Sequence, residues 1–217
     1  MTTEDESLEN KPVLLTPFSL IVAGSSQSGK SVFTSKILSN LKVLTDHTPN
    51  KIIISYSENA DQYTHLKDKI PNIVFRKGLN FEIPENSLIV IEDQMSDAVM
   101  SSRIAELFTR KVHHKRCSVI LIQQNLFPQG KHGRDIHLNT HYYAVFKSPP
   151  FISQVMYIER MTFPHHPHFL IQSYKDATTE PYTYLFLSLH SRVDDRLRVR
   201  AGILPGENEI IYLPNKK

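Results

Sequence analysis

The sequence lacks the features that mark secreted and membrane proteins. It has one cysteine, Cys117, among 217 residues, so no disulfide can form within the chain. No apolar run approaches the roughly 18 to 20 residues that a membrane-spanning helix needs. The first ten residues, MTTEDESLEN, are acidic and polar and do not have the pattern of a signal peptide. We therefore expect a protein of a reducing intracellular compartment, the cytosol or the nucleus, with no membrane partner.

The composition is that of an ordinary globular domain. Hydrophobic residues make up 40% of the chain and charged residues 22%, as in typical globular proteins. A chain of 217 residues can bury the core of one α/β domain and is too short for two large ones. We expect a disordered acidic tail over residues 1–12 and a single domain over residues 13–217, with a peripheral part from about residue 195.

Charges are unevenly distributed although the net charge is only +3. Between Arg103 and Arg134, seven lysines and arginines stand against one acid, Glu106. Such a stretch either attracts a polyanion or forms the solvated face of a helix. The charge pattern by itself leaves both readings open.

Short apolar runs alternate with segments of helical periodicity. The runs predict strands at 18–23, 51–55, 72–75, 87–91, 118–123, 141–146 and 182–189, and the periodic segments predict helices at 31–41, 97–113, 152–160 and 169–177. Because strands that alternate with helices form βαβ units, we predict an α/β fold with a mainly parallel central sheet and helices on both faces. The residues after 189 are expected to form an irregular tail.

Residues 24–31, GSSQSGKS, match the phosphate-binding pattern G-x-x-x-x-G-K-[ST] at every fixed position. The motif follows an apolar run and opens a helical segment, as a P-loop does. Glycines let backbone amides surround phosphate oxygens, and the helix N-terminus adds its positive end. Lys30 would neutralise the β- and γ-phosphates, and the Ser31 hydroxyl would ligate Mg²⁺. The predicted nucleotide-binding residues are Gly24, Ser25, Ser26, Gln27, Ser28, Gly29, Lys30 and Ser31.

The apolar run LIVIED, residues 88–93, ends in two carboxylates. A buried strand delivers such residues to the carboxyl edge of the sheet, beside the P-loop. We assign Glu92 to the magnesium ion and Asp93 to polarising the attacking water, with the order of the two roles open. The alternative is an acid pair that caps the following helix.

A third polar group follows the run 118–122, where Gln123, Gln124 and Asn125 stand in succession. An amide at the tip of a strand beside the P-loop can hydrogen-bond the γ-phosphate or the lytic water. The alternative is an ordinary polar strand end, and the residues alone favour it.

Together these motifs resemble the DNA-packaging ATPases of the FtsK/HerA superfamily, and within it the small packaging ATPases of Maverick/Polinton elements, adintoviruses and virophages. The resemblance covers roughly residues 15–200. It rests on the P-loop, LIVIED, LFTRKVHHKRCSVILIQQNLFPQGK (107–131), LNTHYYAVFKSP (138–149) and ATTEPYTYLFLSLH (177–190). It implies a P-loop NTPase of RecA/FtsK-like fold that uses ATP and Mg²⁺. The sequence departs from the family in its Glu-Asp pair, where Asp-Asp or Asp-Glu is usual.

The resemblance also implies a pentameric or hexameric ring that moves double-stranded DNA into a capsid. Such a motor would act at a capsid or portal vertex, in the host nucleus or a cytoplasmic virus factory, or within the virion. Gln124 would match the sensor glutamine of the family. Arg110 would reach the γ-phosphate of a neighbouring subunit, with Arg116 and Arg134 as competing candidates. The residues expected to contact DNA phosphates without reading bases are Lys115, Arg116, Lys131 and Arg134.

Three other functions compete with genome packaging. A small-molecule kinase would use the P-loop but would leave the acid pair and the basic stretch unexplained. A nucleotide-gated DNA-binding or scaffold protein would bind ATP without hydrolysing it. A replicative helicase would be a close variant of the motor, distinguished by unwinding of strands.

Overall fold

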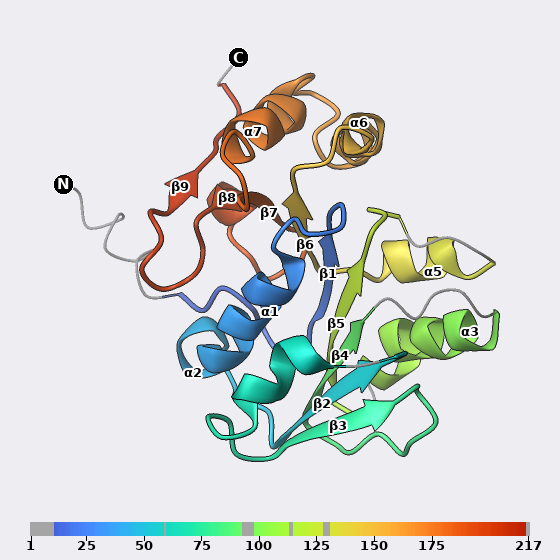
Figure 1. The fold of residues 1–217 in the computed structure, drawn as a ribbon. Helices are drawn as coiled ribbons and strands as arrows, with labels where there is room; N and C mark the ends of the chain where they lie inside the picture. The colour runs from blue at the N-terminus through green and yellow to red at the C-terminus, as the bar shows by residue number, and fades with distance from the viewer. Residues whose placement is uncertain (1–10, 59, 93–97, 113–114, 128–130, 216–217) are drawn as a thin grey trace.

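The computed structural model describes residues 11–58, 60–92, 98–112, 115–127 and 131–215. Within these residues, nine strands form one sheet of order β3-β2-β4-β5-β1-β6-β7-β8-β9 (Figure 1). The strands are β1 (Ser19–Ala23), β2 (Lys51–Tyr56), β3 (Ile73–Lys77), β4 (Ser87–Glu92), β5 (Ser118–Gln123), β6 (Tyr142–Phe146), β7 (Tyr184–Ser188), β8 (Val199–Ala201) and β9 (Ile210–Ile211). The strands β1 to β6 run parallel, and β7, β8 and β9 continue the sheet antiparallel.

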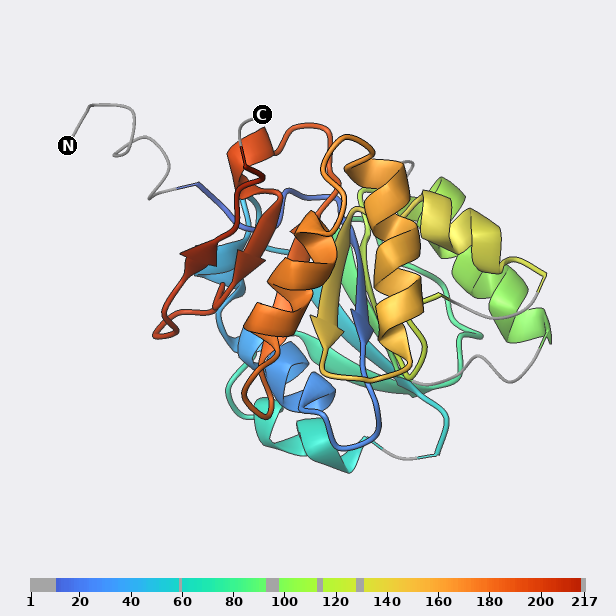
Figure 2. The same cartoon turned by 90° about the horizontal axis from the view of Figure 1, so that it is seen from above.

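Helices cover both faces of this sheet. One face carries α1 (Lys30–Ser39), α2 (Leu41–Leu44) and the 3₁₀ helix η1 (Asp61–Leu66). The other face carries α3 (Ala98–Glu106), the π-helical turn η2 (Leu107–Lys111), α5 (Gly133–Leu138), α6 (Phe151–Thr162) and α7 (Phe169–Ala177). Figures 1 and 2 show α1 on one side of the sheet and α3, α5 and α6 on the other. The prediction of an α/β fold with a mainly parallel, doubly covered sheet is confirmed.

The alternation of strand side chains divides the core between the two faces. In β1, Leu20 and Val22 pack with α1, whereas Ile21 and Ala23 pack with the helices of the opposite face. Both sets are fully buried because successive side chains of a strand point to opposite faces. This explains why the central strands are continuous apolar runs rather than alternating ones. Cys117 is buried next to β5 and packs as part of this core.

Two expectations about element boundaries differ from the structure. The segment predicted as one helix over 97–113 changes from α3 into the π-turn η2, so a single helical period does not describe it. The prediction of an irregular tail was wrong, because a 3₁₀ turn η3 (Asp195–Leu197), β8 and β9 lie in it. β8 pairs with β7 and buries its three residues, so it extends the sheet. Of the predicted acidic tail over residues 1–12, the first ten lie outside the described residues.

Along the part of the chain that the structure describes, no helix combines the length and the apolar character needed to span a bilayer.

Candidate nucleotide-binding site

The P-loop predicted over residues 24–31 connects the end of β1 to the start of α1. Gly24 is buried, and a Cβ atom at this position would lie 2.4 Å from Ser28 Oγ and 2.7 Å from Phe146 Cβ. Gly29 precedes α1 with a φ of 102°, a conformation that residues with side chains rarely adopt. The geometry of the loop therefore requires both fixed glycines of the motif.

Positive and donor groups of the loop lie where a phosphate would bind. Lys30 Nζ donates hydrogen bonds to the carbonyl oxygens of Gly24 at 2.8 Å and Ser25 at 2.7 Å, so its ammonium group lies over the loop. The Ser28 hydroxyl is buried and has no hydrogen-bond partner among the described residues. Because α1 begins at Lys30, the first amide groups of the helix have no carbonyl partner within it. A phosphate group fits this set of donors.

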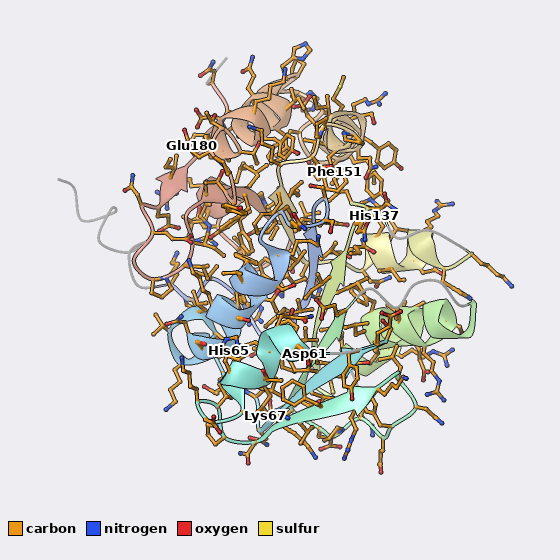
Figure 3. The ribbon with its side chains drawn as sticks, viewed as in Figure 1. Asp61, His65, Lys67, His137, Phe151 and Glu180 are labelled. Atoms are coloured by element: carbon orange, nitrogen blue, oxygen red, sulfur yellow. The ribbon has the colours of Figure 1, made fainter. Side chains whose placement is uncertain are left out.

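The strand β4 brings Glu92 to the first turn of α1. Ser31 Oγ donates a hydrogen bond to Glu92 Oε1 at 3.1 Å, although the two residues are 61 positions apart in the sequence. The side-chain amide of Gln62 donates to the other carboxylate oxygen, Glu92 Oε2. Gln62 belongs to η1, on which Figure 3 labels Asp61 and His65, and η1 packs beside α1. The carboxylate is therefore held between two elements of the same face.

These oxygens suit magnesium in the manner of nucleotide-binding proteins. Mg²⁺ usually takes one or two protein oxygens and completes its coordination with phosphate oxygens and water. Ser31 Oγ and Glu92 Oε1 lie close enough together to bind one cation. In the described part of the chain, no group of three or more His, Cys, Asp or Glu residues gathers at one place. One hydroxyl and one carboxylate oxygen are the number of protein ligands expected for an ion that arrives with a phosphate.

Buried hydroxyl groups surround this carboxylate. Burial, together with the negative charge of Glu92, raises the pKa of the Tyr63 phenol, so this group stays protonated at neutral pH. The Tyr63 phenol lies beside the hydroxyl groups of Ser31 and Thr34, and its hydrogen bonds with them offset part of this rise in pKa. Thr34 lies three positions after Ser31, on the same side of α1. The start of α1 is thus surrounded by polar side chains from other elements in addition to the polar groups of the P-loop.

The two glutamines at the end of β5 differ in burial. β5 lies between β4 and β1, and Gln123 pairs in register with Ala23, the last residue before the P-loop. Gln123 is buried, and its Nε2 donates to the carbonyl oxygen of Leu126 at 3.5 Å. Gln124, predicted as the sensor, follows the strand with an exposed side chain. The sheet order therefore places Gln124 at the same edge as the P-loop and Glu92.

The remaining predicted catalytic residues are Asp93 and three candidate arginines that lie on segments other than the P-loop and β4. Asp93 lies outside the described residues. Arg110 is an exposed residue of η2, in the segment that leads from α3 back toward the start of β5. Arg134 is exposed on α5, and Arg116 is exposed before β5 with a φ of 49°.

The predicted DNA-binding residues do not form one cluster. The carbonyl oxygen of Lys115 accepts a hydrogen bond from the Asn86 amide, which places Lys115 and Arg116 at the amino edge of the sheet, beside the start of β4. Lys131 lies just before α5 and Arg134 lies in its first turn, and the residue after this helix, Asn139, accepts a hydrogen bond from Ser19 Oγ at the start of β1. The two pairs therefore belong to different segments, one before β5 and the other at the start of α5. The sequence places these residues in one stretch, whereas in the fold they belong to two segments with β5 between them.

A cavity of about 520 Å³ lies beside the P-loop. Its walls come from two distant parts of the chain, namely residues 27–33 with Lys36, and the C-terminal residues Tyr182, Tyr184, Leu204 and Glu207. This volume is in the range of sites that bind small molecules.

Gln62 and Tyr63 beside Glu92, and the C-terminal residues of the cavity, were not expected from the sequence. Gln62 and Tyr63 follow β2, which is the neighbour of β4 in the sheet, and strand order cannot be read from a single sequence. One signal was present for the C-terminal residues, because the segment 177–190 already belongs to the family resemblance.

Comparisons with known proteins give structural likenesses only. No family model matches the sequence, and no curated protein matches it significantly. The genome packaging NTPase B204 from Sulfolobus turreted icosahedral virus 2, solved in complex with ATP-gammaS, is 11% identical, with 91% of this chain and 97% of that chain covered at a TM-score of 0.47. The N-terminal domain of zonular occludens toxin from Neisseria meningitidis is 11% identical, with 93% and 96% covered at a TM-score of 0.40. No functional statement about this chain follows from likenesses this low.

Proposed function

We propose that the chain is a Mg²⁺-dependent ATPase that moves double-stranded DNA into a viral capsid. The observation that carries the ATPase proposal is the hydrogen bond from Ser31 Oγ to Glu92 Oε1 at 3.1 Å. It joins the last residue of the P-loop motif to the acid of a different strand. If the motif were only a glycine-serine turn with a surface lysine, this contact with a carboxylate at the end of another strand would not be expected.

The residues of the site then have separate roles. Lys30 and the amides at the start of α1 bind the β- and γ-phosphates, and Ser31 with Glu92 holds the magnesium ion, which neutralises charge on the phosphates. Asp93 is the candidate that accepts a proton from the attacking water, and Gln124 is the candidate that orients this water. Arg110 from a neighbouring copy would stabilise the charge that develops on the γ-phosphate.

The coupling of hydrolysis to DNA rests on different support. It comes from the resemblance of the motifs to packaging ATPases and from the exposed basic residues Lys131 and Arg134 at the start of α5. Contacts of this kind are made to phosphates, so they do not depend on base sequence. The proposed setting is a homo-oligomeric ring at a capsid or portal vertex, in the nucleus or a virus factory of the host cell.

The test is steady-state ATP hydrolysis by the purified full-length chain, with and without double-stranded DNA of random sequence, at low and high salt. We expect hydrolysis that DNA stimulates at low salt, that high salt suppresses, and that Lys30→Ala abolishes. Lys42→Ala is the matched control, because this exposed lysine lies on α2, outside both the P-loop motif and the cavity.

The possible outcomes separate the alternatives. Hydrolysis that ignores DNA would contradict the motor and favour transfer of phosphate to a small molecule. Binding of ATP without any turnover would contradict the enzyme and favour a nucleotide-gated scaffold. Turnover that depends on single-stranded DNA and separates strands would favour a helicase.

A further inference from the structure

The cavity beside the P-loop is lined in part by apolar side chains that are exposed to solvent. Tyr182 is 71% exposed and Val32 is 63% exposed, and both line the cavity. Tyr184 and Leu204, by contrast, are buried and form its inner part. A cavity with apolar walls that opens directly from a phosphate-binding loop has space for the part of a ligand that follows the phosphates.

Tyr182 lies directly against the P-loop. A Cβ atom built at Gly29 would lie 3.4 Å from Tyr182 Cδ1 and 3.5 Å from Tyr182 Cβ, at van der Waals distance. The turn that carries Tyr182 connects α7 to β7, and in the view of Figure 3 α1 lies between Glu180 of this turn and Asp61 of η1. The ring therefore adjoins the loop on the side of α1 away from Glu92.

The backbone of Tyr182 is held in a conformation that its side chain does not favour. Its φ is 66°, in the left-handed region that glycine and asparagine adopt more readily. A large exposed aromatic residue at such a position costs folding stability and brings little burial in return. Residues held in this way are often functional.

A carboxylate is fixed on the C-terminal wall of the same cavity. Glu207 Oε2 accepts hydrogen bonds from the Tyr184 hydroxyl at 2.5 Å and from the Leu204 amide at 3.4 Å. Its other oxygen, Oε1, lies 3.7 Å from Lys36 Nζ. These contacts hold the carboxylate at the cavity, where it can accept a hydrogen bond from an amino group.

We propose that this cavity binds the base of the nucleotide, with the Tyr182 ring stacked on the base and Glu207 accepting from its exocyclic amino group. This inference rests on the proposed function, because the P-loop fixes where the phosphates lie. It adds a ligand class, a nucleoside triphosphate whose base carries an amino group, as adenine does. Stacking on an aromatic ring tolerates different bases, so any discrimination against amino-free bases would come from Glu207.

Isothermal titration calorimetry of the full-length chain in magnesium buffer tests the stacking. The probes are ATP and inorganic tripolyphosphate, which has the phosphates without the base. We expect Tyr182→Ala to weaken ATP binding roughly 5- to 150-fold and to leave tripolyphosphate affinity unchanged, whereas Tyr182→Phe keeps ATP affinity. Tyr157→Ala is the matched control, because Tyr157 is 47% exposed on α6 and outside the cavity.

A second readout separates a binding role from a structural one. Tyr182→Gly relieves the left-handed strain, so we expect its melting temperature to be no lower than that of the wild type while its ATP affinity falls as in Tyr182→Ala. Glu207→Gln is compared for ATP and inosine triphosphate, which has an oxygen in place of the amino group. We expect the variant to lose the preference of the wild type for ATP.

The outcomes distinguish this proposal from the proposed function. Loss of ATP binding in Lys30→Ala together with unchanged ATP binding in Tyr182→Ala would overturn the base pocket and leave the ATPase standing. Equal weakening of ATP and tripolyphosphate by Tyr182→Ala would also overturn it, because the ring would then be supporting the P-loop. ATP binding that does not depend on Lys30 would overturn both proposals.

Photolabelling with 8-azido-ATP, mapped by mass spectrometry, should mark residues 182–184 or 204–207, and labelling confined to other segments would contradict the pocket.

Discussion

The two edges of the parallel sheet use their polar groups differently. At the amino edge, Asp46 Oδ1 accepts hydrogen bonds from the backbone amide and the hydroxyl of Thr16, both at 2.6 Å, and His141 Nδ1 accepts from the Ser19 amide at 3.2 Å. At the carboxyl edge, the buried Ser28 hydroxyl lies inside the P-loop motif beside Lys30 and has no partner among the described residues; the buried Ser188 hydroxyl at the amino edge also has none, but no phosphate-binding motif adjoins it. Polar groups that bond to each other stabilise the fold, whereas groups left without partners favour a ligand that supplies them.

The largest effect that would test this comparison is expected from Lys30→Ala. The substitution removes the ammonium group that lies over the loop, and we expect ATP affinity to fall at least about 100-fold with little change in melting temperature. Calorimetric titration with ATP and thermal unfolding of the same preparation measure both quantities. A large loss of stability with ATP affinity retained would mean that the carboxyl edge is structural as well.

Arg110→Ala tests whether a residue distant from the motif completes the site of a neighbouring copy. We expect normal ATP binding and a loss of turnover of about 1000-fold, because a trans arginine acts on the transition state. Adding Lys30→Ala subunits, which keep Arg110, should partly restore hydrolysis in mixed rings. Absence of rescue at every mixing ratio would contradict the trans role, and the same experiment with Arg116→Ala and Arg134→Ala would test the competing candidates.

Asp93→Asn should retain ATP binding and lose roughly 100-fold or more in hydrolysis, because the amide cannot accept the proton of the attacking water. Glu92→Gln is its counterpart, for which we expect weaker magnesium dependence of binding, since Glu92 meets Ser31. Titrations at several magnesium concentrations and steady-state hydrolysis measure the two effects. Normal hydrolysis by Asp93→Asn with loss of turnover in Glu92→Gln would reverse the assigned order.

The two basic pairs, one before β5 and one at the start of α5, offer a direct comparison for DNA. The double substitution Lys131→Ala with Arg134→Ala should reduce the slope of log affinity against log salt by about 2, because each phosphate contact releases about one counterion. Lys115→Ala with Arg116→Ala is the matched pair at the amino edge, where we expect a smaller change, since Lys115 Nζ already donates to the Ile83 carbonyl at 2.9 Å. Affinity is measured by fluorescence anisotropy over a salt series. A larger effect from the Lys115 and Arg116 pair would place the DNA path beside the start of β4 instead.

The smallest effect concerns stability at the amino edge. Burial raises the pKa of Asp46, but its hydrogen bonds with Thr16 outweigh this and lower it below the usual range. The stabilisation is therefore fully present above about pH 4, the pKa of an unfolded aspartate, and is lost as pH falls toward the lower folded pKa. We expect Asp46→Asn to lower the melting temperature slightly at pH 7 and to reduce its decline below pH 4, with ATP affinity unchanged. An unchanged pH profile would mean that the Thr16 bonds add no stability.

Much of the fold followed from local patterns. The six parallel strands fall close to the apolar runs, and the P-loop connects β1 to α1 as its motif predicts. The C-terminal strands β8 and β9 were missed because they are three and two residues long, with too few positions to show a period. β8 is stabilised by pairing with β7, a contact between residues that a sequence pattern does not connect.

The sequence by itself determined the phosphate end of the site, because the P-loop is eight consecutive residues whose glycine conformations and helix start are local properties. It also determined the class of fold, through strands whose two faces are both apolar. Only the tertiary structure decided which residues surround that loop. The order of strands places Glu92 and Gln62 beside Ser31, and the antiparallel return of β7 places Tyr182 against Gly29. It likewise assigned one basic stretch to two segments, one before β5 and one at the start of α5, because the strand between them is buried in the sheet.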